Sequence, residues 1–315
     1  MNELRKDYLL DKWVIIASGR KKRPSDFVHE TEEVGGVCYF CPGNENMTPP
    51  EICRVEEGGK WAIRCFPNKF PAVSLEDGKK QDGFLTSRPA YGEHEIVVET
   101  SRHDEDFADL SVERIVMALE VYSGRIEELK RRNGIKYVSL FRNKGNGAGA
   151  SFAHSHAQII SLPMVPPEVL EKIEVSKRYA KEKGACPYCG IWKKEVKSER
   201  QIFEDENVAA FAPYASRFPF AAQVMPKRHI GQLGEMTAEE KRSFATAIKK
   251  ILKKLDLEMG DPAYNMLFHI APVSDEMHLH VEVFPRVSKY AGFEFGTGII
   301  INIVPPEEAA EFYRS

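Results

Sequence analysis

The sequence lacks long apolar runs, which limits where the protein can work. No run within the 315 residues approaches the length of a membrane-spanning helix. The first ten residues, MNELRKDYLL, mix charges with leucines and do not have the apolar centre of a secretory signal. These absences predict a cytoplasmic protein with no membrane partner.

An excess of positive charge is also missing. Lysine and arginine total 44 against 47 aspartates and glutamates, which gives a formal net charge of −3. The basic run at 19–23, GRKKR, is short and isolated, so no nucleic-acid partner is expected. The chain is 43% hydrophobic and 29% charged, as in ordinary globular proteins, and is long enough for two domains of common size.

Cysteine is scarce, and its distribution is uneven. There are six cysteines, and a reducing compartment makes disulfides between them unexpected. Four of the six form two CxxC pairs, CYFC at 38–41 and CPYC at 186–189. These pairs therefore need an explanation other than disulfides.

Each CxxC pair opens a similar series of landmarks. A strand ends at His103 in the first half (EIVVETSRH) and at His229 in the second (AAQVMPKRH). A long amphipathic helix follows each, then a strand rich in β-branched or aromatic residues (YVSLF at 137, YNMLF at 264) and an HxH pair. Because the same order occurs twice at long spacing, the sequence predicts a gene duplication and excludes a short-repeat solenoid.

The predicted fold class is α+β, with helices packed on a mostly antiparallel sheet. Ser111 is the expected N-cap of the first long helix, and Thr237 with Glu240 forms a capping box for the second. A further helix over 166–184, ended by Gly184, joins the halves. We expect domains at 1–165 and 166–315.

The CxxC pairs are typical of zinc sites. Two thiolates on one turn suit two corners of a tetrahedron, and histidine nitrogens can supply the other two. The predicted ligand sets are Cys38, Cys41, His103 and His154 in the first half, and Cys186, Cys189, His229 and His278 in the second. Each CxxC could instead be a pair of buried thiols, and His94 competes with His103 on the same strand. The match between the halves favours two zinc ions per chain, each held by four protein ligands and hence structural.

The stretch HSHAQ at 154–158 predicts a nucleophile. If His154 binds zinc, the neighbouring His156 remains available, and a neutral imidazole attacks phosphorus readily near neutral pH. Gln158, on the same face, can donate a hydrogen bond to a phosphoryl oxygen. The alternatives for His156 are a second metal ligand or a strand histidine without chemistry.

A glycine-rich loop, FRNKGNGAGAS at 141–151, leads directly into this strand. Its glycines permit close approach of the backbone, and successive N–H groups can cradle a phosphate beside Asn143 and Lys144. By itself such a loop is often only a turn. Its position before HSHAQ favours a phosphate-binding role.

The segment GASFAHSHAQII at 149–160 resembles the active-site strand of the histidine-triad superfamily. Within it, the sequence is most similar to the galactose-1-phosphate uridylyltransferase family, with features of the ADP-glucose phosphorylase branch. The resemblance covers nearly the whole chain. It implies two duplicated histidine-triad-like domains, of which the first carries the nucleophile and the second a structural metal and a hexose-binding segment. It also implies a homodimer, since the family's C-terminal segment commonly reaches across to a partner.

The resemblance assigns further residues, segment by segment. It places Arg20 and Arg23 at substrate phosphates, and it places the base and ribose near Phe66 and Asn68. It assigns the phosphate loop to Asn143, Gly149 and Ser151. The C-terminal segment KYAGFEFGTG supplies the hexose contacts, which are Lys289, Phe293 and Glu294.

The implied reaction is transfer of uridylyl from UDP-glucose to a hexose 1-phosphate by ping-pong kinetics, through a nucleotidyl-histidine. A glutamine at 158 cannot carry a proton at neutral pH, which favours transfer over hydrolysis. Ser155, where the uridylyltransferases carry proline, and Lys69, where they tend to carry an acidic residue, keep open an ADP-glucose-type phosphorylase and the choice of base. A non-enzymatic, zinc-stabilised nucleotide-binding module is a third alternative. The loop and the single HxHxQ motif favour an enzyme over it.

Overall fold

The computed structural model describes residues 2–6, 13–17, 37–76, 78–273 and 277–315. The α-helices are α1 (Val112–Lys130), α2 (Pro167–Lys183), α3 (Pro187–Glu195), α4 (Ala238–Met259), α5 (Gly292–Thr297) and α6 (Pro306–Arg314). Short 3-10 turns are η3 (Glu45–Met47), η4 (Asn146–Ala148) and η5 (Leu233–Glu235). The strands are β1 (Asn2–Lys6), β2 (Trp13–Ala17), β3 (Cys53–Glu57), β4 (Lys60–Pro67), β5 (Ser87–Pro89), β6 (His94–Val98), β7 (Tyr137–Lys144), β8 (His156–Leu162), β9 (Gln201–Glu204), β10 (Val208–Phe211), β11 (Ala222–Pro226), β12 (Tyr264–His269) and β13 (His280–Pro285).

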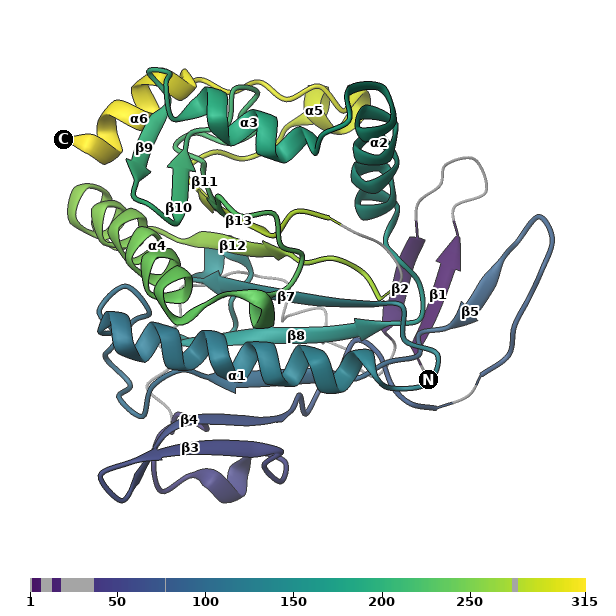
Figure 1. Cartoon of the computed structure of the whole chain (residues 1–315). Coiled ribbons are helices and arrows are strands. Elements are labelled where there is room, and N and C mark those ends of the chain that lie inside the picture. Colours follow the sequence, from purple (N-terminus) through teal and green to yellow (C-terminus); the bar gives the residue numbers. More distant parts are fainter. Residues whose placement is uncertain (1, 7–12, 18–36, 77, 274–276) are drawn as a thin grey trace.

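One ten-stranded sheet runs through both halves of the chain (Figure 1). From its outer edge inward, the first half contributes β3, β4, β6, β8 and β7, and the second contributes β9, β10, β11, β13 and β12. The two inner strands pair antiparallel at the centre, with Tyr264 opposite Lys144. The strand order is therefore the same in both halves, as expected from a duplication, and the pairings confirm a mostly antiparallel α+β fold.

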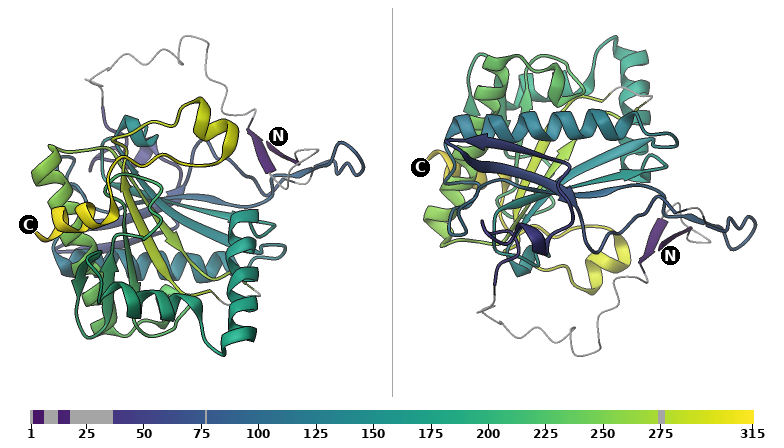
Figure 2. Two further views of the ribbon diagram at one scale, coloured as in Figure 1. Left: turned by 90° about the horizontal axis from the view of Figure 1, so that it is seen from above. Right: turned by 90° about the horizontal axis from the view of Figure 1, so that it is seen from below.

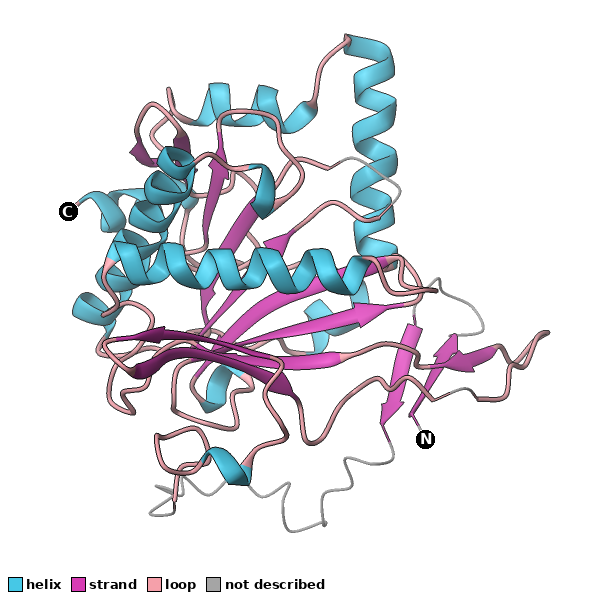
Figure 3. Ribbon diagram, turned by 60° about the horizontal axis from the view of Figure 1, so that its bottom comes forward, coloured by secondary structure: helices cyan, strands magenta, loops and turns pink. Residues whose placement is uncertain are grey.

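The two long helices, α1 and α4, lie together across one face of this sheet (Figure 3). Residues of β8 show why that face is apolar: Ala157 and Ile159 are fully buried and join the core formed with Leu119 of α1 and Phe244 of α4. Side chains alternate along a strand, so His156 and its neighbours at even positions face the other side. The sheet thus separates the main core from the face that carries the candidate chemistry.

The helix ends follow the sequence signals. The hydroxyl of Ser111 accepts a hydrogen bond from the backbone N–H of Arg114, 3.1 Å away. Thr237 and Glu240 form the reciprocal capping box of α4. Gly184 follows α2 with φ of 67°, a left-handed conformation that glycine adopts without steric cost. The predicted helices are confirmed.

A small three-stranded sheet, β2-β1-β5, projects at one end of the molecule (Figure 2). The C-terminal segment crosses the face of the main sheet opposite to α1 and α4, and α5 lies there. The chain then ends in α6, whose Ala309 and Ala310 pack against Ala212. Within the described residues, no helix is both long and apolar enough to cross a membrane.

Candidate active site

Four side chains from distant parts of the first half converge on one point. Sγ of Cys41 lies 3.4 Å from Nδ1 of His103 and 3.7 Å from Nδ1 of His154, and Sγ of Cys38 lies 3.6 Å from the same His154 nitrogen. A tetrahedral zinc with ordinary Zn–S and Zn–N bonds places sulfur and nitrogen about 3.5 Å apart. The four atoms therefore fit a metal ion without rearrangement.

The second half repeats this arrangement. Sγ of Cys189 lies 3.7 Å from Nδ1 of His229 and 3.5 Å from Nδ1 of His278, and Sγ of Cys186 lies 4.0 Å from the latter. The local backbone differs, since Cys186 caps the start of α3 whereas the first CxxC forms a turn. Both sets predicted from the sequence are brought together, and each could hold a metal ion.

Hydrogen bonds fix the ring orientation of the buried ligand in each set. Nε2 of His154 donates to the carbonyl oxygen of Thr100, and Nε2 of His278 donates to that of Pro226, both at 2.8 Å. With the proton held on Nε2, the lone pair on Nδ1 points at the cysteines, as metal-binding histidines require. Burial and the neighbouring thiol Cys38 raise the pKa of Cys41 to about 11, so a thiolate there needs a cation beside it.

The neighbouring His156 is held in the opposite tautomer. Its Nδ1 lies 2.8 Å from the carbonyl oxygen of His154, which can only accept, so the proton is on Nδ1 and the lone pair is on Nε2. Burial lowers the pKa of His156, and the ring is therefore neutral at neutral pH. β8 begins at His156, directly after Ser155, which follows the residue that carries this carbonyl.

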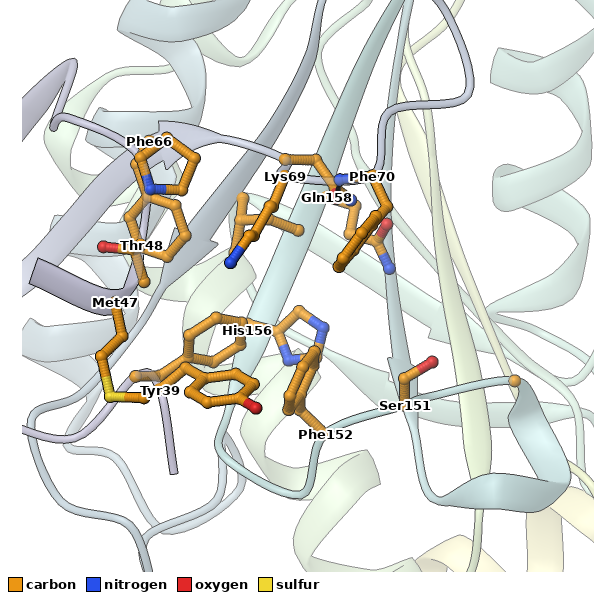
Figure 4. Close-up of a pocket in the computed structure, with 15 residues that line it drawn as sticks. Tyr39, Met47, Thr48, Phe66, Lys69, Phe70, Ser151, Phe152, His156 and Gln158 are labelled. Carbon is orange, nitrogen blue, oxygen red and sulfur yellow. Dashed lines mark hydrogen bonds between the residues drawn. The ribbon is translucent and has the colours of Figure 1, made fainter. Parts of the chain in front are cut away.

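A cavity of about 470 Å³ opens in front of this ring (Figure 4). That volume suits a small-molecule ligand. Five aromatic residues line it: Tyr39, Phe40, Phe66, Phe70 and Phe152. The ring centres of Phe40 and Phe152 are 4.8 Å apart, and those of Phe40 and Phe66 are 5.6 Å apart. An aromatic wall of this kind suits the flat face of a nucleobase.

Polar groups line the same cavity close to His156. Gln158 follows it along β8, and Asn68 and Lys69 come from the turn after β4. Gly149, with φ of 84°, and Ser151 come from the loop before the strand. Together these residues form a site with a neutral nucleophile, hydrogen-bond donors and one cation.

Comparison with known proteins identifies the family. The family model described as galactose-1-phosphate uridyl transferase, N-terminal domain, matches residues 1–166, and a model for a domain of unknown function matches 98–312. A galactose-1-phosphate uridylyltransferase of Thermotoga maritima is 32% identical over 100% of this chain and 98% of its own length. The chain belongs to the galactose-1-phosphate uridylyltransferase family.

Two further relatives show the breadth of this family. An ADP-glucose phosphorylase of Arabidopsis thaliana is 33% identical over 99% of this chain and 92% of its own length. The crystal structure of an Arabidopsis thaliana ADP-glucose phosphorylase with bound ADP-glucose aligns with a TM-score of 0.79 at 30% identity, covering 100% of this chain and 99% of that one. A uridylyltransferase structure aligns with a TM-score of 0.85 at 31% identity, covering 99% and 97%.

Beneath the active-site strand lies a buried ionic network that the sequence analysis missed. Arg142 is at its centre and forms two bonds with carboxylates: Nε donates to Glu99 at 3.0 Å, and Nη2 donates to Asp106 at 2.5 Å. It also forms two bonds with hydroxyls: Nη2 donates to Ser155 at 2.8 Å, and Nη1 donates to Tyr264 at 2.5 Å. Ser155 in turn donates to Glu99 at 2.6 Å. Ser155, which lies between the two histidines, thus faces this network and is 2% exposed. Ser155 therefore anchors the start of the strand on the core side of the sheet, and it does not line the cavity.

The second-half counterpart of the active site is occupied by charged groups. Glu282 stands where Gln158 stands in the first half, and it lies 3.7 Å from Lys172 and 3.5 Å from Nε2 of His269. His269 stacks on His280 with ring centres 4.3 Å apart. A carboxylate at this place repels phosphate, so these residues give the second half no equivalent nucleophilic site. The three ligand-type side chains, His269, His280 and Glu282, do lie close enough together to be a metal-type cluster.

Several predicted contacts lie outside the cavity. Asn143 faces Asn265 of β12, and Oδ1 of Asn143 accepts a hydrogen bond from Nδ2 of Asn265 at 2.8 Å. Lys289, Phe293 and Glu294 belong to the exposed C-terminal segment around α5 and do not line this chain's own cavity. Arg20 and Arg23 lie outside the described residues. The assignments of these four residues as substrate contacts, and of Arg20 and Arg23 at phosphates, stay predictions.

Proposed function

We propose that the protein is a hexose-1-phosphate uridylyltransferase that moves uridylyl from UDP-glucose to galactose 1-phosphate through a covalent histidine. The observation that carries the proposal is the tautomer of His156. Its Nδ1–H is bound to the His154 carbonyl, and its lone pair on Nε2 faces an aromatic-walled cavity. Membership of the family over the full chain supports the same reaction.

The reaction takes two in-line displacements at one phosphorus. Nε2 of His156 attacks the α-phosphorus of UDP-glucose, the bond to the bridging oxygen breaks, and glucose 1-phosphate leaves with that electron pair. The imidazolium that forms is stabilised through Nδ1–H by the carbonyl of His154. A phosphate oxygen of galactose 1-phosphate then attacks the same phosphorus, releases UDP-galactose and restores neutral His156.

The other cavity residues stabilise charge on the phosphoryl oxygens. Gln158 offers N–H donors next to His156, and the loop at Gly149 and Ser151 brings backbone and hydroxyl donors to the same side. Lys69 adds a positive charge at the cavity wall. Because the Gln158 amide cannot accept a proton at neutral pH, it does not activate water, and the intermediate persists until a sugar phosphate binds.

We further propose that the metals are zinc, one in each half, and that both are structural. Two cysteines and two histidines per site supply four ligands, which leaves no open coordination position for substrate. The first ion supports the chemistry indirectly, because its ligand His154 also holds His156. The free cysteines suit a reducing compartment, and we place the protein in the cytoplasm.

A nucleotide-sugar phosphorylase is the second candidate, and one observation favours it: the 33% identity to an ADP-glucose phosphorylase over 99% of the chain. Its acceptor is inorganic phosphate, and the histidyl intermediate is common to both reactions. Ser155 does not separate the two, because its hydroxyl is bound to Glu99 and Arg142 on the far side of the strand. Lys69 does line the cavity and so bears on the choice of nucleotide.

An acceptor assay separates the two candidates. The enzyme is loaded with UDP-glucose, freed of released glucose 1-phosphate, and offered galactose 1-phosphate or phosphate separately. We expect UDP-galactose to form at least about tenfold faster than UDP, since binding energy from the sugar can be used at the transition state. Faster release of UDP with phosphate would reverse the assignment, and the same pair run with ADP-glucose decides the base.

We also propose a homodimer of two-domain chains, with domains at 1–165 and 166–315. The C-terminal segment supports this, because it exposes an apolar row for which a partner surface is the natural cover. The row comprises Phe293 (49% exposed), Phe295 (77%), Ile299 (63%), Ile301 (60%) and Ile303 (78%). In the dimer, Lys289, Phe293 and Glu294 would complete the partner's hexose site.

Sedimentation tests the dimer directly. We expect the wild-type protein to sediment as a dimer at micromolar concentration, and Phe295→Asp with Ile301→Asp to sediment as a monomer. The monomer should bind galactose 1-phosphate at least about tenfold more weakly, because its hexose contacts come from the partner. A wild-type protein that sediments as a monomer and transfers at full rate contradicts the proposal.

A further inference from the structure

Gln158 is held by a neighbour that lies behind the cavity wall. Oε1 of Gln158 is 2.9 Å from Nε2 of His94. His94 belongs to β6, the strand paired with β8, and its side chain projects from the same face of the sheet as Gln158. It is 4% exposed and is not among the residues that line the cavity.

The proton on His94 can be placed from its other contact. Nδ1 of His94 is 3.2 Å from the backbone nitrogen of Ala72. A backbone N–H can only donate, so Nδ1 accepts, and the proton of the neutral ring is on Nε2. Nε2–H must therefore donate. The amide of Asn68, 3.2 Å away through Nδ2, is itself a donor, which leaves the Gln158 oxygen as the acceptor.

This contact decides which end of the Gln158 amide faces the substrate. With Oε1 bound to His94, the amino group is turned away from His94 and toward the side of the cavity where Ser151 lies (Figure 4). Rotating the amide by half a turn would present its oxygen to a phosphoryl group, where two acceptors repel each other. It would also set two donors, Nε2–H of His94 and the Gln158 amino group, against each other. The histidine thus disfavours the unproductive orientation.

We propose that His94 is a positioning residue for nucleotide transfer, which holds the Gln158 amide with its N–H donors directed at the α-phosphate. The inference rests on the proposed function, since it gives Gln158 a phosphate to bind. The imidazole of His94 acts only through Gln158 and does not touch the phosphate.

The placement of Asn68 does not depend on the imidazole. Its backbone nitrogen donates to the carbonyl oxygen of His94 at 2.7 Å, and its Oδ1 accepts from the backbone N–H of Phe70 at 2.9 Å. Loss of the His94 ring removes the acceptor of the Ala72 N–H but leaves both of these Asn68 bonds in place. The effect should therefore fall mainly on kcat.

A double-variant cycle measures this coupling. Gln158→Ala removes the donor and is expected to slow nucleotidylation of His156 by about 100-fold, as for other single donors to a reacting group. His94→Leu should slow it by about 10- to 100-fold, with KM for UDP-glucose changed less than about threefold. In the Gln158→Ala background, His94→Leu should change the rate by less than about twofold, because nothing is left to position.

Two further variants separate positioning from support of the strand. His94→Gln keeps an N–H donor close to the place of Nε2 and should retain a rate within about fivefold of wild type. Val97→Ala alters the same strand on its core side, where Val97 is fully buried, and should lower stability without lowering the rate of the folded protein. A structural role for His94 predicts the reverse: additive losses in the cycle and no rescue by glutamine.

The tautomer is open to direct measurement. Long-range ¹H–¹⁵N correlation spectra of ¹⁵N-labelled protein at pH 7.5, assigned by comparison with His94→Gln, should show His94 neutral with its proton on Nε2. A proton on Nδ1, or equal transfer by wild type and His94→Leu, overturns the positioning role alone. If wild type forms no nucleotidyl-histidine at all, the proposed function fails and the positioning role fails with it.

Discussion

Replacing His156 by asparagine is expected to reduce nucleotide transfer by at least about 10⁴-fold, because the proposed nucleophile is removed. Asparagine is the informative substitution. Its Nδ2 can donate to the carbonyl of His154 as Nδ1 of the histidine does at 2.8 Å, so the start of β8 keeps its local structure. What is lost is the lone pair on Nε2 and, with it, the covalent intermediate. Denatured protein from a UDP-glucose incubation should then carry no acid-labile, base-stable label.

The second half of the chain provides a matched control. His280 makes the same bond to the carbonyl of His278, also at 2.8 Å, but faces charged groups and not the cavity. His280→Asn should therefore leave the transfer rate of folded protein within about twofold of wild type. Metal content must be equal in the two variants. An His156→Asn protein that keeps its metal and still transfers nucleotide at an appreciable rate would contradict the mechanism.

Loss of either metal should have the largest effect on stability, and only one of the two should alter the chemistry. Cys186→Ser removes a ligand of the second site and not of the site beside His156, so we expect a loss of at least about 3 kcal/mol and a fall in Tm of roughly 4 °C or more, with little change in rate. Cys38→Ser should destabilise to a similar extent. It should also reduce the rate, because His154 holds the ring of His156 through its carbonyl.

The measurement compares thermal unfolding with the rate per folded molecule. Elemental analysis of carefully purified wild type should give two metal ions per chain, and one in each variant. Fewer than one ion in the wild type would remove the argument for both sites. An equal loss of rate in the two variants would show instead that the second ion also reaches the chemistry.

The sequence alone was sufficient to predict the candidate metal ligands, because their pattern occurs in both halves. Without the repeat, His94 and His103 are equal candidates for the metal; the structure brings His103 to the two cysteines and His94 to Gln158. The helix caps at Ser111 and Thr237 could also be predicted, because they depend only on local hydrogen bonds.

The rest depends on contacts between strands that are distant in sequence. Glu99 and Arg142 look like ordinary surface charges in the sequence, and only the pairing of β6, β8 and β7 buries them together. Cys53 and Cys65 look unrelated in the sequence, but they face each other across β3 and β4. For the aromatic wall of the cavity, the sequence offered one clue. Tyr39 and Phe40 lie inside the first CxxC, so one segment contributes to both the metal site and the cavity wall.

The central pairing of β7 with β12 has a consequence for how the chain is made. In a nascent first half, β7 is paired with β8 on one edge, but its other edge has no partner until residues 264–268 of β12 have been translated. At about 5–20 residues per second, β7 stays an open strand edge for roughly ten seconds on the ribosome. During that time it can be paired wrongly by the β7 of another nascent chain on the same message. The wait for β12 is thus a step at which the nascent chain is exposed to aggregation.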